Sequence, residues 1–227
     1  MANLGPGRPR LEQRRRQGTT PRAEILDAAA ELFTTKGYAN TSTRAVADAV
    51  GIRQASLYHH FAAKDDILDA LLAETVAGPV EFAQRMMTEP EAAVVQLYAL
   101  ALFDVRQLRT ARWNLGALYL LPELRTERFV AFRCRRDELR GHYERLAAES
   151  SAAAGESDDS RILPFRLVET VIAIRYDEGA AGIGIDREIP AAIMRTVGYR
   201  GDIEQVRAAA DALVTRLGEA HSTSAAG

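Results

Sequence analysis

The sequence predicts an all-α protein. Of its 227 residues, 47% are hydrophobic, 26% are charged and only 7% are aromatic, and alanine and leucine are frequent. Apolar residues recur at intervals of three and four in several segments, as one face of an α-helix requires. Glycine and proline separate these segments. A chain of this length forms one or two domains and buries about 70% of its unfolded surface.

Residues 1–18 are expected to be a disordered arm, because they are rich in glycine, proline and arginine and contain few apolar residues. A first helix should begin at Thr20, whose hydroxyl can cap free N–H groups, with Pro21 in its first turn. It should end at Lys36 and Gly37. Its apolar stripe consists of Ile25, Leu26, Ala29, Leu32 and Phe33.

Residues 42–64 contain two short helical patterns. In the first, Ser42 or Thr43 offers a capping hydroxyl, and Gly51 can adopt the left-handed conformation of a helix C-cap without a steric penalty. Its apolar face consists of Val46, Ala47 and Val50.

The second pattern covers residues 54–61 and is anchored by Leu57 and Phe61, four residues apart. Its other faces carry the polar side chains of Gln54, Ser56, Tyr58 and His59. Two helices this short, joined by about four residues with a glycine, match a DNA-binding helix-turn-helix. The alternative is an ordinary helical hairpin with incidental polar residues.

This segment resembles the DNA-binding domain of the tetracycline-repressor (TetR) family. The resemblance covers residues 20–72 and rests on Val46-Ala47, Ala49-Val50-Gly51-Ile52, Leu57-Tyr58-His59-His60-Phe61 and Lys64. It implies a three-helix DNA-binding domain, residues 19–64, followed by a helical effector-binding and dimerisation domain, residues 65–218. It also implies that DNA is approached by Thr43, Arg44, Gln54, Ala55, Ser56 and Tyr58, with His60 and Lys64 at phosphates.

Three residues depart from the family's usual pattern. Val50 stands where alanine is common, Arg53 stands where a serine or threonine cap is common, and Ala55 stands where glycine is common. Arg53 cannot cap as a hydroxyl does, so we expect it to reach a phosphate or a base. His59, on the polar side, completes the candidate DNA-binding set. These departures affect which bases are read and leave the docking mode unchanged.

Charge is distributed unevenly along the chain. Residues 1–64 contain ten Lys/Arg and five Asp/Glu, a net charge of +5, so the total of −2 leaves −7 for the remainder. A basic N-terminal part agrees with binding to DNA phosphates. The arm, with arginines at 14, 15 and 16, either contacts a DNA groove or phosphates, or is a solvated tail that aids solubility.

A fourth helix should begin at Lys64, where Asp65 and Asp66 suit its positive end. We expect a kink or interruption after Gly78 and Pro79, because proline has no N–H. A buried core helix should follow over residues 91–110, and a charged, solvated helix over residues 127–148. In the latter, i, i+4 pairs are expected between Arg133 and Asp137 and between Arg140 and Glu144.

Residues 150–160 read as a loop, residues 179–184 as a turn, and residues 219–227 as a disordered tail. The helix over residues 161–176 is apolar nearly all round, and that over 202–217 has a 3-4 spaced seam. Both could form a four-helix bundle with their copies in a second subunit, as the resemblance implies; packing within one chain is the alternative. The candidate interface residues are Ile162, Phe165, Val168, Ile172, Ile203, Val206, Ala210, Leu213 and Leu217.

Other classes of function have little support in the sequence. No Ser/His/Asp, Cys/His, paired-carboxylate or metal-ligand spacing is present, so we expect no catalysis, metal or cofactor. The single cysteine, Cys134, excludes an intramolecular disulfide; it is inert or, less expected, a redox sensor. There is no run of 18 apolar residues and no secretory signal, so a cytoplasmic protein is expected.

The sequence therefore predicts a homodimeric transcription regulator that binds double-stranded palindromic DNA and is released by a small-molecule effector. A repressor is the first expectation, and an activator is the alternative, because that depends on where the operator lies relative to the promoter. Candidate pocket residues are Tyr98, Arg106, Trp113, Tyr119 and Tyr176, which are aromatic or polar groups in apolar helices. Their chemistry favours a largely apolar effector. The alternatives are a non-specific architectural DNA-binding protein and a helical enzyme.

Overall fold

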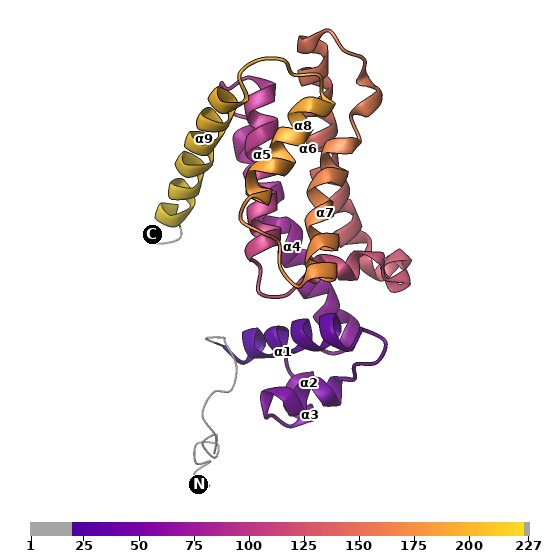
Figure 1. Ribbon diagram of the computed structural model, residues 1–227. Helices are drawn as coiled ribbons and strands as arrows, with labels where there is room; N and C mark the ends of the chain where they lie inside the picture. The colour runs from indigo at the N-terminus through magenta and orange to yellow at the C-terminus, as the bar shows by residue number, and fades with distance from the viewer. Residues whose placement is uncertain (1–19, 225–227) are drawn as a thin grey trace, which may run out of the picture. The chain divides into compact units, whose positions relative to one another are not determined.

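The computed structural model describes residues 20–224 and is all-helical over that range (Figure 1). The α-helices are α1 (Pro21–Thr35), α2 (Thr43–Val50), α3 (Gln54–Tyr58), α4 (Lys64–Met86), α5 (Ala93–Thr110), α6 (Val130–Ala154), α7 (Leu163–Glu178), α8 (Ile185–Thr196) and α9 (Ile203–Ser224). Short 3-10 helices are η1 (Leu115–Leu120), η2 (Pro122–Arg125), η3 (Glu127–Phe129) and η4 (Asp158–Ser160). The predicted arm, residues 1–18, lies outside the described residues.

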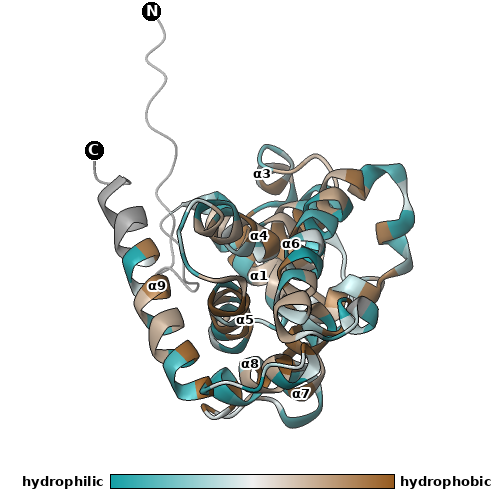
Figure 2. Ribbon diagram, turned by 90° about the horizontal axis from the view of Figure 1, so that it is seen from above, coloured by the Kyte–Doolittle hydropathy of each residue, from teal (hydrophilic) through white to brown (hydrophobic). Residues whose placement is uncertain are grey.

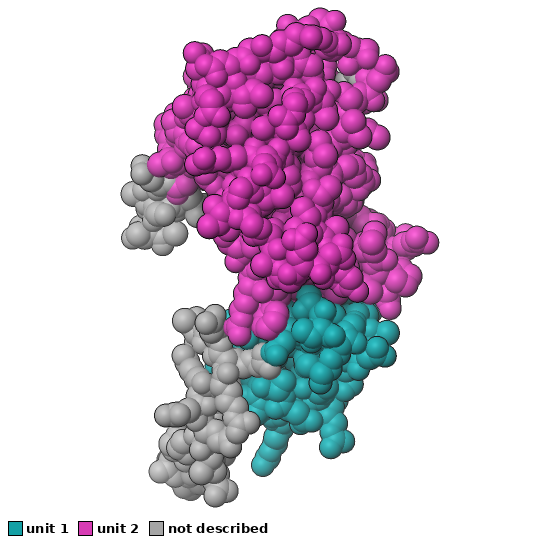
Figure 3. All heavy atoms as spheres, viewed as in Figure 1, with its two compact units in different colours: residues 1–70 teal, residues 71–227 magenta. Residues whose placement is uncertain are grey.

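The chain divides into two compact units, residues 1–70 and 71–227 (Figure 3). The division falls within α4, a few residues beyond the boundary at residue 64 that the motif suggested. Helix α4 therefore contributes its first turns to unit 1 and the remainder to unit 2.

In unit 2, α5 is the central helix and packs against α6, α7, α8 and α9 (Figure 1). Its residues from Leu97 to Leu102 are all buried, and Figure 2 shows the apolar character of this helix. Arg109 of α5 forms a two-pronged ion pair with Asp186 of α8, with N···O distances of 2.7 and 3.1 Å. The residues predicted as a buried core helix thus hold the unit together.

We expected a kink or an interruption at Pro79; helix α4 continues through this residue, so there is no interruption. Proline cannot donate to the carbonyl four residues earlier, which belongs to Thr75. The side chain of Gln107 supplies the missing donor, with its Nε2 2.7 Å from the Thr75 carbonyl oxygen. Gly78 leaves room for it, because a Cβ there would lie 2.7 Å from Gln107 Oε1. A side chain from α5 therefore completes the hydrogen bonding of α4.

Replacing Gln107 with leucine should lower the free energy of unfolding by about 1–3 kcal/mol, because the Thr75 carbonyl would lose its donor. Urea unfolding of the variant and the parent measures this difference. The matched control is Gln84→Leu, since Gln84 bonds to Glu138 at an exposed site. Equal losses in the two variants would contradict the role given to Gln107.

Helix α6 is longer than its charge pattern suggested and includes part of the predicted loop at residues 150–160. Ser150 and Ser151 are buried, and the helix ends at Gly155 with a left-handed φ of 74°. The Arg140–Glu144 pair forms with an N···O distance of 3.4 Å. Arg133 instead donates to the carbonyls of Leu124 and Thr126, so its predicted pairing with Asp137 is replaced.

The C-terminal helix also exceeds its predicted end at residue 217. The backbone is helical to Ser224, where a disordered tail was expected from residue 219, and residues 225–227 lie outside the described part. Cys134 is exposed on α6. Within the described residues, no helix has the length and apolar character needed to span a membrane.

Candidate nucleic-acid interface and effector pocket

Unit 1 is a helix-turn-helix supported by α1 (Figure 1). The Ser42 hydroxyl accepts from the Ala45 N–H at 3.1 Å and caps α2, and the Thr20 hydroxyl caps α1 in the same way. Gly51 ends α2 with φ 78°, the left-handed conformation that glycine enters without strain. The two hydroxyl N-caps and the glycine C-cap are those that the sequence predicted.

Helix α3 is held by a small apolar anchor. Leu57 is fully buried and Phe61, in the turn that follows, is 5% exposed. Arg53 precedes the helix and makes no side-chain cap, as expected for an arginine at this position. All members of the predicted DNA-binding set on α3 and on the residues that flank it are exposed: Arg53, Gln54, Ala55, Ser56, Tyr58, His59 and His60. Helix α3 therefore presents its polar side to solvent.

Thr43, Gln54 and Tyr58 join α2 to α3 through their side chains. Gln54 Nε2 lies 3.0 Å from Thr43 Oγ1 and 3.2 Å from the Tyr58 hydroxyl oxygen, and the two hydroxyl oxygens are 3.1 Å apart. Sequence spacing could not reveal this contact, because it joins residues 11 and 15 positions apart across the turn. Arg44 remains exposed, 3.9 Å from Asp48.

Lys64 has a structural partner within unit 1. Its ammonium nitrogen lies 2.9 Å from the Tyr38 carbonyl oxygen and 4.0 Å from the centre of the Tyr38 ring. It also borders a depression of about 520 Å³ between the starts of α2 and α4, shared with Thr43 and Tyr58. Lys64 can therefore support unit 1 and still face an anion in this depression.

The predicted interface residues divide into three groups. Six supply the chain's own core: Phe165, Val168, Val206, Ala210, Leu213 and Leu217. The seam of α9 is covered by α5 of the same chain, which favours the intrachain alternative for this helix. Ile172 and Ile203 are half-buried, whereas Ile162 is 54% exposed.

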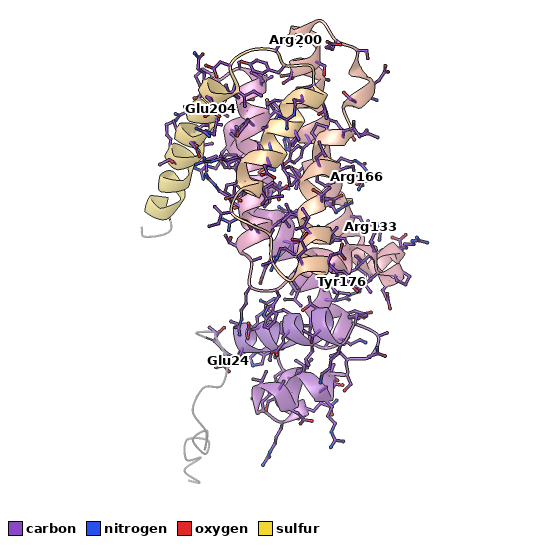
Figure 4. The ribbon with its side chains drawn as sticks, viewed as in Figure 1. Glu24, Arg133, Arg166, Tyr176, Arg200 and Glu204 are labelled. Atoms are coloured by element: carbon purple, nitrogen blue, oxygen red, sulfur yellow. The ribbon has the colours of Figure 1, made fainter. Side chains whose placement is uncertain are left out.

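Two pockets in unit 2 meet at Gly116. The η1–α7 pocket has a volume of about 500 Å³ and is lined by Gly116, Ala117, Tyr119, Leu120, Arg136, Arg166, Glu169, Ile172, Ala173, Tyr176 and Asp177. The α4–α5 pocket, about 170 Å³, is lined by Glu74, Thr75, Gln107, Leu108, Ala111, Trp113, Asn114, Leu115, Gly116 and Arg175. Arg166 and Tyr176 of the larger pocket are seen on α7 in Figure 4.

The five predicted ligand residues are therefore not gathered at one place. Tyr119 and Tyr176 border the η1–α7 pocket and Trp113 borders the α4–α5 pocket. Tyr98 is a core residue, 1% exposed, and Arg106 forms ion pairs with Asp211 and Asp186. Tyr98 and Arg106 thus line neither pocket.

The pockets also contain charged residues that the apolar pattern did not indicate. Arg136 and Arg166 both pair with Glu169, and the Arg136 guanidinium lies 5.3 Å from the centre of the Tyr119 ring. The Nε atom of Arg136 is buried and has no hydrogen-bond partner. The sequence did not indicate Arg136 as a pocket residue, because arginines on a charged helix are expected to lie at the surface.

A buried carboxyl group is a further feature that the sequence did not reveal. Asp104 of α5 is 4% exposed, and the Tyr143 hydroxyl donates to its Oδ2 at 3.2 Å. Burial raises the pKa of Asp104 from 3.8 to about 7, opposed by the Tyr143 hydrogen bond and reinforced by the charge of Glu169. Among the described residues, no group of three or more His, Cys, Asp or Glu side chains is arranged to hold a metal ion.

The fold and the exposed helix-turn-helix place this chain in the class of helix-turn-helix regulators. Residues 25–71 match the family model described as bacterial regulatory proteins, tetR family. The crystal structure of Mycobacterium smegmatis AmtR is 54% identical, with a TM-score of 0.85, over 91% of this chain and 98% of that one. The chain belongs to the TetR family.

Curated relatives match over only part of the chain. The HTH-type transcriptional repressor KstR2 of Mycobacterium tuberculosis is 45% identical over 56 residues, 25% of this chain and 28% of that protein. The repressor AcnR of Corynebacterium glutamicum is 32% identical over 82 residues, 32% of this chain and 44% of that protein. The matched part thus spans less than half the length of these relatives.

Proposed function

We propose that the chain is a ligand-responsive transcriptional repressor that binds a palindromic operator as a homodimer. The observation that carries this proposal is the exposed polar face of α3, fixed by Leu57 and Gly51 within a helix-turn-helix of this family. Two recognition helices enter successive major-groove turns when they lie about 34–36 Å apart. A dimer therefore suits an operator with two inverted half-sites.

The depression between α2 and α4 suits a phosphate of the DNA backbone. Hydroxyls of Thr43 and Tyr58 and the ammonium group of Lys64 border it, and all can donate to phosphate oxygens. Arg44 and Arg53 are exposed nearby in sequence and add positive charge. We assign these residues, with His60, to the backbone, and Gln54, Ala55, Ser56 and His59 to the side facing the bases.

The outward face of α7 is the surface we assign to the dimer. Apolar side chains are unusually exposed there: Ile162, which precedes the helix, is 54% exposed, Leu163 42% and Tyr176 75%. Exposed apolar patches on soluble proteins mark interaction surfaces. Thr170 lies seven residues after Leu163 and is exposed on the same face, whereas Ala173 and Tyr176 are exposed further round the helix and also line the η1–α7 pocket, so a partner subunit here would border that pocket. This assignment replaces α9, whose apolar seam is already covered.

We assign the effector to the two pockets that meet at Gly116. The larger one has the volume of a small-molecule site and combines apolar, aromatic and charged walls, so an effector with both an apolar part and a polar head fits better than a purely apolar one. The solved structure of AibR, described as a complex with isovaleryl coenzyme A and operator DNA, is 18% identical with a TM-score of 0.62, so it supports the fold alone.

Helix α4 offers a route from effector to DNA. The Thr75 carbonyl accepts from Gln107, and the Thr75 hydroxyl accepts from Tyr119 at 2.7 Å. Thr75, Gln107 and Tyr119 all border one of the pockets. An effector that competes for these groups would alter α4 next to Pro79, and the first turns of α4 belong to unit 1. The effector releases DNA to the extent that it prefers the altered conformation.

The proposal is tested by selecting bound sites from a random duplex library and sizing the complex. We expect an inverted-repeat consensus bound by an even number of subunits, and a large specificity ratio at physiological salt. Arg44→Ala should weaken binding to all sequences, by about ten-fold or less for a lost phosphate contact, and reduce the salt slope by about one. An architectural protein would instead show steep salt dependence without a consensus.

A further inference from the structure

The contacts of Gln54 determine which way its side-chain amide faces. Its nitrogen, the Thr43 hydroxyl oxygen and the Tyr58 hydroxyl oxygen form a triangle with sides of 3.0, 3.2 and 3.1 Å. All three side chains lie at the surface, and Tyr58 is 47% exposed. The triangle is therefore part of the face that the protein offers to DNA.

Counting hydrogens favours the orientation in which the amide nitrogen faces the two hydroxyls, as in the structure. With the nitrogen facing the hydroxyls, its two hydrogens and one hydroxyl hydrogen supply all three contacts. With the amide reversed, the two hydroxyls would have only two hydrogens for three contacts, and one pair of oxygens would meet without a hydrogen. The nitrogen of Gln54 therefore faces Thr43 and Tyr58, and its oxygen, Oε1, faces away from them.

We propose that Gln54 reads an exocyclic amine in the major groove, adenine N6 or cytosine N4, through Oε1, and that Thr43 and Tyr58 are positioning residues for this reading. The inference rests on the proposed function. A free glutamine amide can turn over and either donate or accept, so it discriminates poorly between amine and carbonyl edges. Held by two hydroxyls, it presents an acceptor, which pairs with the amines and repels guanine O6 and thymine O4.

The same count leaves one hydroxyl hydrogen unused. Either Thr43 or Tyr58 donates to the other, and the remaining hydrogen is free to meet a phosphate oxygen in the neighbouring depression. One triangle thus links backbone positioning to base reading. Removing either hydroxyl should lower the affinity for all DNA sequences. It should also free the Gln54 amide to rotate and so weaken its discrimination between bases, and separate measurements can distinguish these two effects.

The first step of the test locates the base pair that Gln54 faces. Sites are selected with the full-length protein and with Gln54→Ala, and the base pair whose preference disappears in the variant is the one in contact. An inverted-repeat consensus with no position that depends on Gln54 would overturn the inference and leave the proposed function standing. Absence of any consensus would overturn both.

The second step removes single groups from that base pair. Purine in place of adenine, or 2-pyrimidinone in place of cytosine, deletes the amine; 2-aminopurine for guanine, or 5-methyl-2-pyrimidinone for thymine, deletes the carbonyl oxygen. Deleting the amine should weaken binding by the parent about ten-fold and by Gln54→Ala hardly at all, so weaker base pairing cancels in the comparison. Deleting the oxygen should affect both proteins equally.

The third step tests the positioning residues. The double variant Thr43→Val, Tyr58→Phe removes both hydroxyls and keeps the shape of the side chains, so its penalty for the missing amine should fall to less than about three-fold. Thr43→Ser keeps a hydroxyl and should retain the parent's penalty, with thermal unfolding confirming that both variants fold. A Gln54-dependent penalty on oxygen deletion, or an unchanged amine penalty in the double variant, would overturn the inference.

Discussion

Replacing Asp104 with asparagine is expected to raise the free energy of unfolding at pH 8 by up to about 4 kcal/mol and to leave it nearly unchanged at pH 4. The reason is that burial raises the pKa of this carboxyl from 3.8 to about 7. Between these values the native state holds a proton that the unfolded state has released. The stability of the parent must therefore fall as pH rises through this range.

Urea unfolding at pH values from 4 to 8 measures the effect. The parent should lose stability with rising pH, and Asp104→Asn should lack that part of the loss, because an amide cannot ionise and can still pair with Tyr143. The matched control is Asp137→Asn on α6, since the Asp137 side chain is 56% exposed. Identical pH profiles for the parent and Asp104→Asn would contradict the buried, protonated state of this group.

Leu57→Ala is expected to remove operator recognition. Helix α3 has five residues and Leu57 is the one buried among them, so truncation should lower the stability of unit 1 by about 2–5 kcal/mol. Without its anchor, α3 would no longer hold its polar residues in one geometry. Weak, salt-sensitive binding should persist, because the arginines that we assign to phosphates remain.

Urea unfolding and operator affinity at physiological salt check this expectation together. Ser56→Ala is the matched control for the stability measurement alone, because Ser56 precedes Leu57 on the same helix and is exposed, but is itself assigned to the side facing the bases. It should leave the stability unchanged within about 0.5 kcal/mol. Retention of specific binding by Leu57→Ala would show that α3 is held by something other than its apolar anchor.

The DNA-binding unit was predictable because its determinants are local. Each determinant acts on residues close to it in sequence. Ser42 caps α2, Gly51 ends it in a left-handed conformation, and the apolar side chains of Leu57 and Phe61 are buried. The contact between Gln54 and the Thr43 hydroxyl was not predictable, because it crosses from α3 to α2.

The structure of unit 2 differs from the sequence prediction at positions where contacts between helices determine the local conformation. Small polar residues such as Ser150 and Ser151 read as loop, yet they are buried within α6. Pro79 reads as a break, yet Gln107 of α5 repairs the hydrogen bonding. The 3-4 seam of α9 correctly indicated a packed helix, but periodicity does not tell which chain covers an apolar face.

The single cysteine gives this protein a built-in attachment point for a physical probe. Cys134 is exposed on α6, so a thiol-reactive spin label would modify one position in each subunit without any prior substitution. In a dimer the two labels define one interspin distance. Pulsed electron resonance could measure that distance with and without operator DNA, and again as effector is added. A residue of no assigned function would then report whether the two subunits move relative to each other when DNA or effector binds.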